Sequence, residues 1–339
     1  MFKFGLIGSF AACFVSAASA QEVINIGWVP AMVSSPLVIA EEKGYFKQQG
    51  LKVELSPIQS VSVGLPMLST NRIQILEGGL QGGLFNALAR GFPVAIVADR
   101  ASTPLGHTLM VRKDLSSTVK TLADLKGKVV ATNATGSTLS YELDKLLQTA
   151  GLNLNDVETK VVSFTQLSAA FSNKAIDAAI AITPISYQLE EQGVALPLLS
   201  IDDVLPNMTM AVTLINTDWA KEKPKAAEGF FYAMFKAVRE FCQAYHNGSN
   251  RQEIADIMLR TRVVDNADLL KHFWGSRRVN GTVNVQALRD VVAWYRNEKL
   301  LSADLPDSKL FDSRFVDRAA SQLGPFVLEN PGSGVRGCD

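Results

Sequence analysis

The chain has 339 residues, of which 47% are hydrophobic, and its 33 basic and 33 acidic residues give a formal net charge of +0. This length and apolar content are sufficient for two domains with substantial cores. The balanced charge argues against nucleic acid or an anionic membrane surface as a partner.

The first 20 residues have the pattern of a secretory signal peptide. Lys3 supplies the positive charge, residues 4–15 form an apolar segment, and residues 18–20 are a small-residue cleavage site. The alternative is a membrane anchor, but the apolar run is shorter than the roughly 20 residues that a spanning helix needs. A lipoprotein would use Cys13, which lacks the usual aliphatic residue three places before it. We therefore expect a soluble mature protein in the periplasm.

Two cysteines remain after this cleavage. Cys242 lies on a helical apolar stripe, where it would act as a small core residue. Cys338 belongs to a C-terminal segment, 326–339, that we expect to be loose. The periplasm permits a disulfide between them, but their spacing gives it no support, so the pairing stays open.

The first predicted unit is a strand, a helix and a second strand. The strand at 24–28 leads through a loop, 29–35, into an apolar helix that begins at Ser34-Ser35-Pro36, where serine suits the cap and proline the first turn. The strand at 51–55 follows, and the order predicts parallel pairing. The loop then lies at the carboxyl edge of the sheet, where ligands bind in open α/β folds. The helix N-terminus there favours an anionic or acceptor-rich ligand.

The same alternation continues. After a loop at 60–64 we expect a helix through 65–68, a strand at 72–76 and a glycine-rich turn, 78–83, that opens a helix at 84–89. The glycines permit close approach of the backbone to a ligand. No Gly-Lys-Ser/Thr follows, so this is not a phosphate loop. A strand at 94–98 completes the unit.

A second unit repeats this layout. Thr121 and Asp124 are a candidate capping box. A strand at 129–131, a small polar loop at 132–138 and a helix at 139–149 come next. A further strand at 161–162 and a short helix at 167–171 are predicted after them. Residues 68–74 and 171–177 resemble each other, and this echo places Thr183-Pro184 opposite the glycine-rich turn of the first unit.

The chain is expected to cross between the units near residues 103–112 and to return in a strand at 210–215. Beyond the return it is mainly helical, with helices at 224–245, 252–259, 267–273, 285–297 and 314–323. Seven apolar residues of the first of these follow three-four spacing and predict a core stripe. They are Phe231, Met234, Phe235, Val238, Phe241, Cys242 and Tyr245.

Residues 42–54, Glu-Lys-Gly-Tyr-Phe-Lys-Gln-Gln-Gly-Leu-Lys-Val-Glu, carry a family resemblance. They resemble the N-terminal signature of periplasmic substrate-binding proteins of nitrate/sulfonate/taurine-type ABC importers, the SsuA/TauA-like and NMT1-like group. The resemblance covers residues 24–318. It departs at Gln74, where the family usually has the Asp that Asp177 keeps in the second unit, and we expect that position to be structural.

The resemblance implies a two-lobed α/β fold of the type II periplasmic binding proteins, with mostly parallel sheets flanked by helices. Lobe I would comprise residues 21–106 and 211–325, and lobe II residues 107–210. Crossover strands would join the lobes, which would close on a small solute. A permease in the inner membrane would then be the partner of a monomeric protein.

Enzymes of similar fold are an alternative. Sulfinate desulfinases use a cleft cysteine, but the first loop has none, and the cysteine-rich iron motif of pyrimidine synthases is absent. The three histidines lack metal-site spacing. His246, at a helix end, is expected to be either a surface residue or a C-capping residue, and His107 near the crossover could touch a ligand. We therefore expect no catalytic residue, no metal and no cofactor.

The predicted ligand-binding residues lie at carboxyl-edge turns. Hydroxyl and amide groups would bind the head group, and an indole would form an apolar wall. The residues are Trp28, Ser34, Ser35, Gly79, Gln81, Ser137, Thr138 and Thr183. Arg100 could pair with an anion, but we expect a solvated surface charge.

The sequence thus predicts a solute-binding protein for a small organic or inorganic anion, such as a sulfonate, a nitrate-like ion or an aromatic carboxylate. Pyrimidine-like compounds also stay open as ligands. The rival from another class is a periplasmic sensor that presents its closed form to a membrane receptor.

Overall fold

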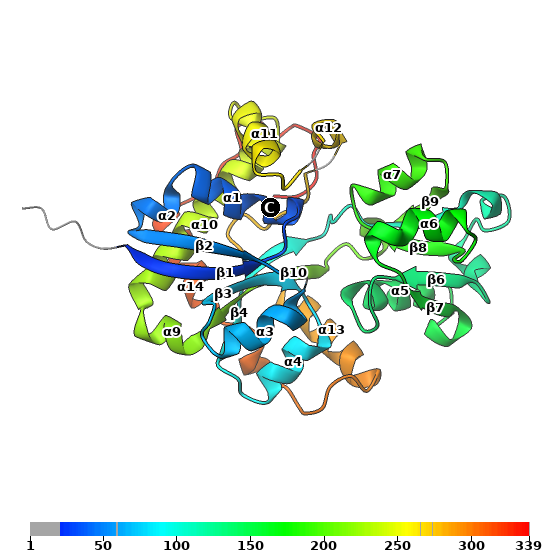
Figure 1. The fold of residues 1–339 in the computed structure, drawn as a ribbon, viewed down its shortest axis with the longest axis horizontal. Helices are drawn as coiled ribbons and strands as arrows, with labels where there is room; N and C mark the ends of the chain where they lie inside the picture. The colour runs from blue at the N-terminus through cyan, green and yellow to red at the C-terminus, as the bar shows by residue number, and fades with distance from the viewer. Residues whose placement is uncertain (1–20, 59, 265, 273, 339) are drawn as a thin grey trace, which may run out of the picture.

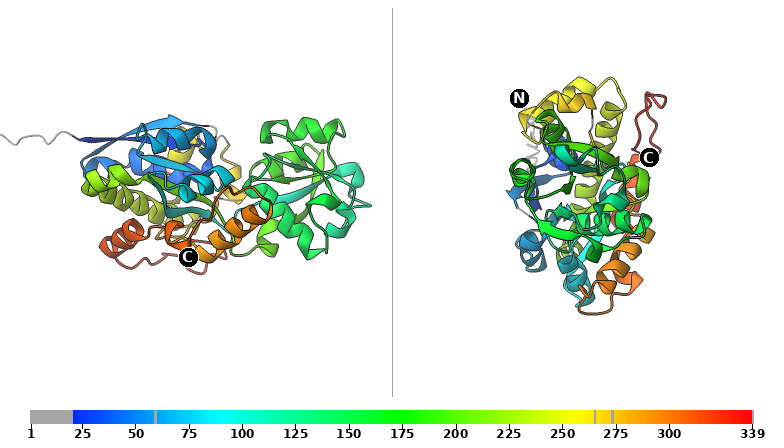
Figure 2. Two further views of the ribbon diagram at one scale, coloured as in Figure 1. Left: turned by 90° about the horizontal axis from the view of Figure 1, so that it is seen from below. Right: turned by 90° about the vertical axis from the view of Figure 1, so that its right-hand side faces the viewer.

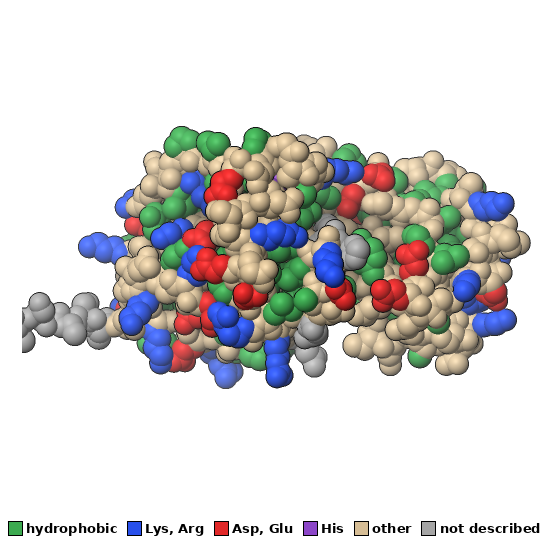
Figure 3. Space-filling model, turned by 90° about the horizontal axis from the view of Figure 1, so that it is seen from above, with side chains coloured by type: hydrophobic (Ala, Val, Ile, Leu, Met, Phe, Trp, Pro, Cys, Tyr) green, Lys and Arg blue, Asp and Glu red, His purple; other side chains and the backbone are tan. Residues whose placement is uncertain are grey.

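The computed structural model describes residues 21–338 except 59, 265 and 273, so the expected signal peptide lies outside the described residues. Two α/β lobes stand side by side, each built on a five-stranded sheet (Figure 1). Basic and acidic side chains are scattered over both lobes, as the balanced composition leads one to expect (Figure 3).

The sheet of lobe I has the strand order β2-β1-β3-β10-β4. Strand β1 pairs in parallel with β2 and β3, whereas β10 runs antiparallel to β3 and β4. The strands are β1 (Glu22–Trp28), β2 (Leu51–Pro57), β3 (Ile75–Gly79), β4 (Val94–Ser102) and β10 (Thr209–Asn216).

The sheet of lobe II repeats this plan in the order β7-β6-β8-β5-β9. Strand β6 pairs in parallel with β7 and β8, and β5 is antiparallel to β8 and β9. The strands are β5 (Thr108–Arg112), β6 (Val129–Thr132), β7 (Glu158–Val161), β8 (Ala178–Ala181) and β9 (Ala195–Ser200). In each lobe the strand that follows a crossing of the chain runs opposite to the other four, so each sheet is mixed. The expected two-lobed α/β class is confirmed.

Helices cover both faces of each sheet. In lobe I, α1, α2, α10, α11 and α14 share one core cluster, and α3, α4 and α13 share the other (Figure 1). The lobe I helices are α1 (Ser35–Glu42), α2 (Tyr45–Gln48), α3 (Val61–Ser69), α4 (Gly82–Ala89), α9 (Thr217–Glu222), α10 (Pro224–Tyr245), α11 (Arg251–Arg260), α12 (Leu269–His272), α13 (Val285–Asn297) and α14 (Arg314–Leu323). The lobe II helices are α5 (Thr138–Thr149), α6 (Leu167–Ser172), α7 (Ile185–Glu191) and α8 (Ile201–Val204).

Short 3-10 helices join these elements. They are η1 (Met32–Ser34), η2 (Lys113–Leu115), η3 (Leu122–Leu125), η4 (Leu154–Asp156), η5 (Phe164–Gln166) and η6 (Asp307–Lys309). The predicted capping box of Thr121 and Asp124 is present at the start of η3. Within the described part of the chain, none of the helices combines the length and the apolar composition that crossing a membrane requires.

Several boundaries in lobe I differ from the prediction, and those of α3 and β3 affect how the glycine-rich segment is read. Helix α3 begins at Val61, where a loop was expected, and β3 begins at Ile75 rather than at 72. Asn71 adopts a left-handed φ of 56° and turns the chain before the strand. Gly78 therefore lies in the strand and not in a turn, and a Cβ there would stand 2.3 Å from Cγ2 of Val61. The glycine is needed for the packing of α3 on the sheet.

The sequence echo corresponds to one structural device used twice. In lobe I, Oε1 of Gln74 accepts a hydrogen bond of 2.9 Å from the backbone N–H of Asn25 on β1. In lobe II, Oδ2 of Asp177 accepts one of 2.9 Å from the N–H of Val129 on β6. Both side chains pin the turn before the third strand to the first strand, so this position is structural, as expected.

The long helix α10 forms the core of lobe I. The seven residues of its predicted stripe are all buried, and the adjacent Phe230 stacks on Phe46 of α2 with ring centroids 5.3 Å apart. Cys242 also does more than fill space, because it forms a disulfide with Cys338.

The C-terminal segment, which was expected to be loose, is attached to the end of α10. Besides the disulfide, His246 at the end of α10 contacts it through Nδ1, 2.8 Å from the hydroxyl of Ser333, and Nε2, 2.9 Å from the carbonyl oxygen of Gly337. His246 occupies the expected C-cap position, but it is buried and not on the surface. The spacing of Cys242 and Cys338 in the sequence could not reveal that they form a disulfide.

The disulfide closes a long loop, since its cysteines are 96 residues apart. Cross-linking such a loop restricts the unfolded chain, so we expect Cys242→Ser/Cys338→Ser to lower the free energy of unfolding by about 2–4 kcal/mol. Urea unfolding measures this difference in the free energy of unfolding. Reductant should destabilise the wild type and leave the double variant unchanged; equal stability of the oxidised wild type and the variant would contradict the prediction.

Candidate ligand-binding cleft

A cavity of about 510 Å³ lies between the lobes. Lobe I contributes the loop after β1 and the segment 262–277, lobe II contributes the turn between β8 and α7, and the crossing from β4 to β5 contributes Leu105 and His107. The volume is in the range of small-molecule sites. The cavity is therefore the candidate site, at the carboxyl edge of β1 and β8.

Two short crossings connect the lobes beside the cavity. The first joins β4 to β5 and the second joins α8 to β10. They are bonded to each other, because Oγ1 of Thr103 donates to the carbonyl oxygen of Leu205 at 3.0 Å and accepts from the N–H of Met208 at 2.9 Å. The carboxylate of Asp202 also accepts from the N–H groups of Leu105 and Gly106. The crossings are thus bonded into one paired connection, which is called the hinge below.

Ser34 and Ser35 hold the first loop in shape. Ser34 is at the N-cap position but makes no side-chain cap hydrogen bond; its hydroxyl donates instead to the carbonyl oxygen of Val29 at 2.6 Å and accepts from Arg100. The hydroxyl of Ser35 donates to Met32 at 2.6 Å. Both serines are fully buried, and neither lines the cavity. The expected side-chain cap is therefore wrong, and their predicted ligand-binding role stays a prediction.

Four other predicted residues lie together at a contact between the lobes. Gln81 and Ser137 form an isolated β-bridge, and the hydroxyl of Thr138 donates to the carbonyl oxygen of Leu80 at 2.9 Å. Gly79 lies beside this contact, because a Cβ there would stand 4.0 Å from Oγ1 of Thr138. None of the four lines the cavity.

Helix α13 strengthens this contact by reaching from lobe I to lobe II (Figure 2). The hydroxyl of Tyr295 donates to the carbonyl oxygen of Gly136 at 2.8 Å, and Nε1 of Trp294 donates to Asp144 at 2.9 Å. The lobes are therefore bonded at α13, and the residues of this contact do not line the cavity.

Of the remaining predicted residues, Thr183 lines the cavity and Trp28 does not. The hydroxyl of Thr183 donates to the carbonyl oxygen of Gly106 at 2.7 Å, which ties the β8–α7 turn to the hinge. Trp28 is buried in the core that α1 and α10 share.

Arg100 is buried, so the expectation of a solvated surface charge is wrong. Its Nε lies 2.9 Å from Oε2 of Glu77, and the two side chains are 3% and 0% exposed. Glu77 is on β3 and Arg100 on β4, with β10 between them. The useful signal in the sequence was Glu77, because an acid inside an otherwise apolar strand needs a buried partner.

Arg277 is a second buried arginine and lines the cavity. It donates to the carbonyl oxygens of Arg100, at 2.7 Å, and Met32, at 3.2 Å. Burial, followed by repulsion from Arg100, lowers its pKa to about 9, although Glu77 and Asp99 act in the opposite direction. The guanidinium therefore stays charged at neutral pH, and it was missed because its segment has no strand or helix pattern.

His107 lies at the hinge end of the cavity and pairs with Glu142 of α5. Its Nδ1 is 3.0 and 3.1 Å from the two carboxylate oxygens. Burial alone would lower the pKa of His107, but the attraction and hydrogen bond of Glu142, with a smaller effect of Asp202 on α8, raise it above 6.5. The possible ligand contact of His107 is thus compatible with its position in the lining.

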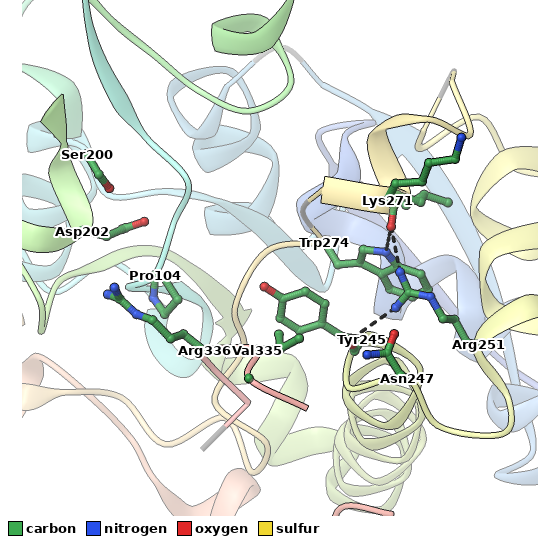
Figure 4. Close-up of a pocket in the computed structure, with 12 residues that line it drawn as sticks. Pro104, Ser200, Asp202, Tyr245, Asn247, Arg251, Lys271, Trp274, Val335 and Arg336 are labelled. Atoms are coloured by element: carbon green, nitrogen blue, oxygen red, sulfur yellow. Dashed lines mark hydrogen bonds between the residues drawn. The ribbon is translucent and has the colours of Figure 1, made fainter. Parts of the chain in front are cut away.

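Trp274 lines both the cavity and a second hollow of about 410 Å³, which Figure 4 shows. Its Nε1 donates to the carbonyl oxygen of Leu270 at 2.6 Å, and the guanidinium carbon of Arg251 is 4.6 Å from its ring centroid. Arg336, from the C-terminal segment, lines the outer hollow and is 3.3 Å from Asp203 of lobe II. Trp274 is therefore a well-fixed wall of the cavity.

Comparison with known proteins shows the family. The family model described as NMT1/THI5 like matches residues 32–244, and the chain belongs to this family. A putative thiamine biosynthesis protein of Haemophilus influenzae is 31% identical over 165 residues, 48% of this chain and 50% of that protein. The 4-amino-5-hydroxymethyl-2-methylpyrimidine phosphate synthase THI11 of Saccharomyces cerevisiae is 27% identical over 159 residues, 46% of this chain and 44% of that protein. The chain spans about half the length of the curated relatives it matches.

Solved structures show the fold. A putative periplasmic sulfonate-binding protein SsuA of Methylobacillus flagellatus has a TM-score of 0.71 at 20% identity, covering 94% of this chain and 98% of that one. The periplasmic nitrate-binding protein NrtA of Synechocystis has a TM-score of 0.68 at 17% identity, with 89% of each chain covered. The resemblance inferred from residues 42–54 is confirmed for family and for the two-lobed periplasmic binding protein fold.

The Glu77–Arg100 pair makes a testable contribution to stability. Glu77→Gln leaves the buried Arg100 guanidinium without its counter-ion, so we expect the free energy of unfolding to fall by about 3–5 kcal/mol. Glu77→Leu/Arg100→Met removes both charges and should cost less than the single change. Urea unfolding of the three proteins tests this, and a double variant less stable than Glu77→Gln would contradict it.

The raised pKa of His107 predicts how stability depends on pH. A histidine whose pKa is higher in the folded state contributes stability that is fully present below its unfolded pKa, near 6.5, and is lost as pH rises through the folded value. The melting temperature of the wild type should therefore decline relative to His107→Gln/Glu142→Gln above pH 6.5. A constant difference from pH 5 to 9 would exclude the charged pair.

Proposed function

We propose that the protein is the periplasmic solute-binding component of an ABC-type importer. In this role it captures a small anion in the cleft between the lobes and delivers it to a permease in the inner membrane. The observation that carries the proposal is the lining of the cavity. It contains Arg262, Arg277 and His107, and none of its described residues is Asp or Glu.

The arrangement of the lobes supports capture by closure. Lobe I, lobe II and the hinge all contribute to the lining, so a ligand that fills the cavity contacts both lobes. Such contacts are complete only when the lobes are together, and a ligand shifts a hinge equilibrium by its difference in affinity for the two states. The closed form would then be the one that the permease recognises.

An enzyme on the same fold is the second candidate, favoured by the synthase among the relatives. Cys242 and Cys338 are joined in a disulfide, and the described lining contains no cysteine, so a cysteine nucleophile of the desulfinase kind has no counterpart in it. A periplasmic sensor would share the cavity and differ only in its membrane partner. A permease and an ATPase encoded beside this gene would support transport, and a histidine kinase would support sensing.

A thermal-shift screen of the purified protein against sulfonates, carboxylates, inorganic anions and pyrimidines tests the proposal. A ligand at 100 times its dissociation constant should add about 2.7 kcal/mol to the free energy of unfolding. Calorimetry should then show one ligand per protein, and mass spectrometry should recover it unchanged after incubation. Conversion of the ligand into a product would overturn the binding-protein proposal in favour of the enzyme.

A further inference from the structure

We propose that the cavity binds an organic monoanion with an apolar body, and that Arg277 binds its anionic group. This inference rests on the proposed function, because it names the class of solute captured. It assigns the head group to the segment between α12 and α13, which the sequence did not suggest as a binding segment.

The cluster of charged groups beneath the cavity holds more guanidinium groups than carboxyl groups. Two buried arginines, Arg100 and Arg277, and the half-buried Arg278 lie close to two buried carboxylates, Glu77 and Asp99, as their mutual electrostatic interactions show. Arg100 is paired with Glu77 at 2.9 Å. Burial raises the pKa of both carboxyl groups, that of Asp99 to about 6. Protonation of either would only increase the excess of positive charge, which a bound anion would neutralise.

Arg277 is the member of this cluster that lines the cavity, and Glu77 and Asp99 act on it only from a distance, without a direct ion pair. It is 3% exposed, and within the described chain no carboxylate lies within 4 Å of it. Its recorded hydrogen bonds go to two backbone carbonyl oxygens, and its Nε is buried without a partner. A guanidinium has five N–H groups, so several stay available. Bonds from a guanidinium to an anionic oxygen are among the stronger hydrogen bonds in proteins.

The walls of the cavity are suited to an apolar body. The apolar side chains come from both lobes and include Met32, Val33, Ile182, Ile185, Val264 and Trp274. An inorganic anion such as nitrate has only four heavy atoms and would leave most of the 510 Å³ unfilled. Burial of apolar ligand surface against these walls contributes affinity in proportion to area. A carboxylate or sulfonate on an aromatic or alkyl body uses both features of the site.

His107 adds a polar group without adding net charge. Its Nδ1 is engaged by Glu142, so Nε2 is the ring nitrogen left for a ligand. The pair of His107 and Glu142 is neutral overall when both are ionised, which leaves Arg277 and Arg262 as the net cations of the described lining. Arg262 is exposed to solvent, so the buried Arg277 is expected to attract an anion more strongly.

Calorimetry on the wild-type protein tests the solute class with defined probes. The organic anions are benzoate, benzenesulfonate and hexanoate; benzamide is the neutral counterpart, and nitrate and sulfate are the inorganic ions. We expect at least one organic anion to bind about tenfold or more tightly than benzamide, nitrate and sulfate, because loss of a charged hydrogen bond or of the apolar contacts costs at least that much. Failure of all three organic anions to bind overturns the inference.

Variants test the assignment of Arg277. Arg277→Met should weaken the best organic anion by about 10- to 100-fold and leave benzamide unaffected. Arg239→Met is the matched control: Arg239 also donates to two backbone carbonyl oxygens and lies over an aromatic ring, Phe326, but it does not line the cavity. The affinity of the Arg239→Met variant for the same organic anion should stay within about twofold of the wild-type affinity. Equal effects of the two variants overturn the role of Arg277.

The inference and the proposed function fail differently. Stoichiometric binding of nitrate or sulfate in preference to the organic anions overturns the solute class and leaves capture intact. Chemical conversion of a bound organic anion overturns capture and leaves the solute class and Arg277 intact. If Arg277→Met does not fold, the comparison of benzoate with benzamide and nitrate on the wild type still decides the class of solute.

Discussion

The ion pair between Glu77 and Arg100 is the interaction on which the cleft depends. Charges withdrawn from water must be paired and hydrogen-bonded, so this pair ties β3 to β4 across β10. From it, contacts extend to the first loop, because Arg100 donates to Ser34 and Arg277 donates to the carbonyl oxygens of Arg100 and Met32. Buried charged side chains therefore hold this wall of the cavity in place.

The two lobes share a plan but not a role. Their strand orders correspond, and Gln74 and Asp177 perform the same task in each. The interface between them is asymmetric. On one side α13 and the start of α5 are bonded across the lobes, and on the other the apolar cavity is open between them. A ligand in the cavity would therefore contact both lobes away from the bonds that α13 makes.

Much of the fold was predictable because its signals are local. Residue spacing within short segments predicts several features correctly. These are the α10 stripe, the capping box at Thr121, the bounds of α13 and α14, and the strand–helix–strand order. The errors at β3 and α3 have a different cause. Gly78 resembled a turn residue, but its small size serves contact with Val61 of a neighbouring helix, which no local pattern encodes.

The sequence by itself determined the family, the two-lobed α/β class and the similarity of the segments around Gln74 and Asp177, because motif and periodicity are properties of short segments. Only the tertiary structure decided which side of the interface is a cavity, that Arg100 is buried, that Cys242 pairs with Cys338, and that Arg277 reaches the cleft. These depend on residues far apart in the chain. Burial and charge pairing are set by what packs against a side chain, and that is known only when the lobes are assembled.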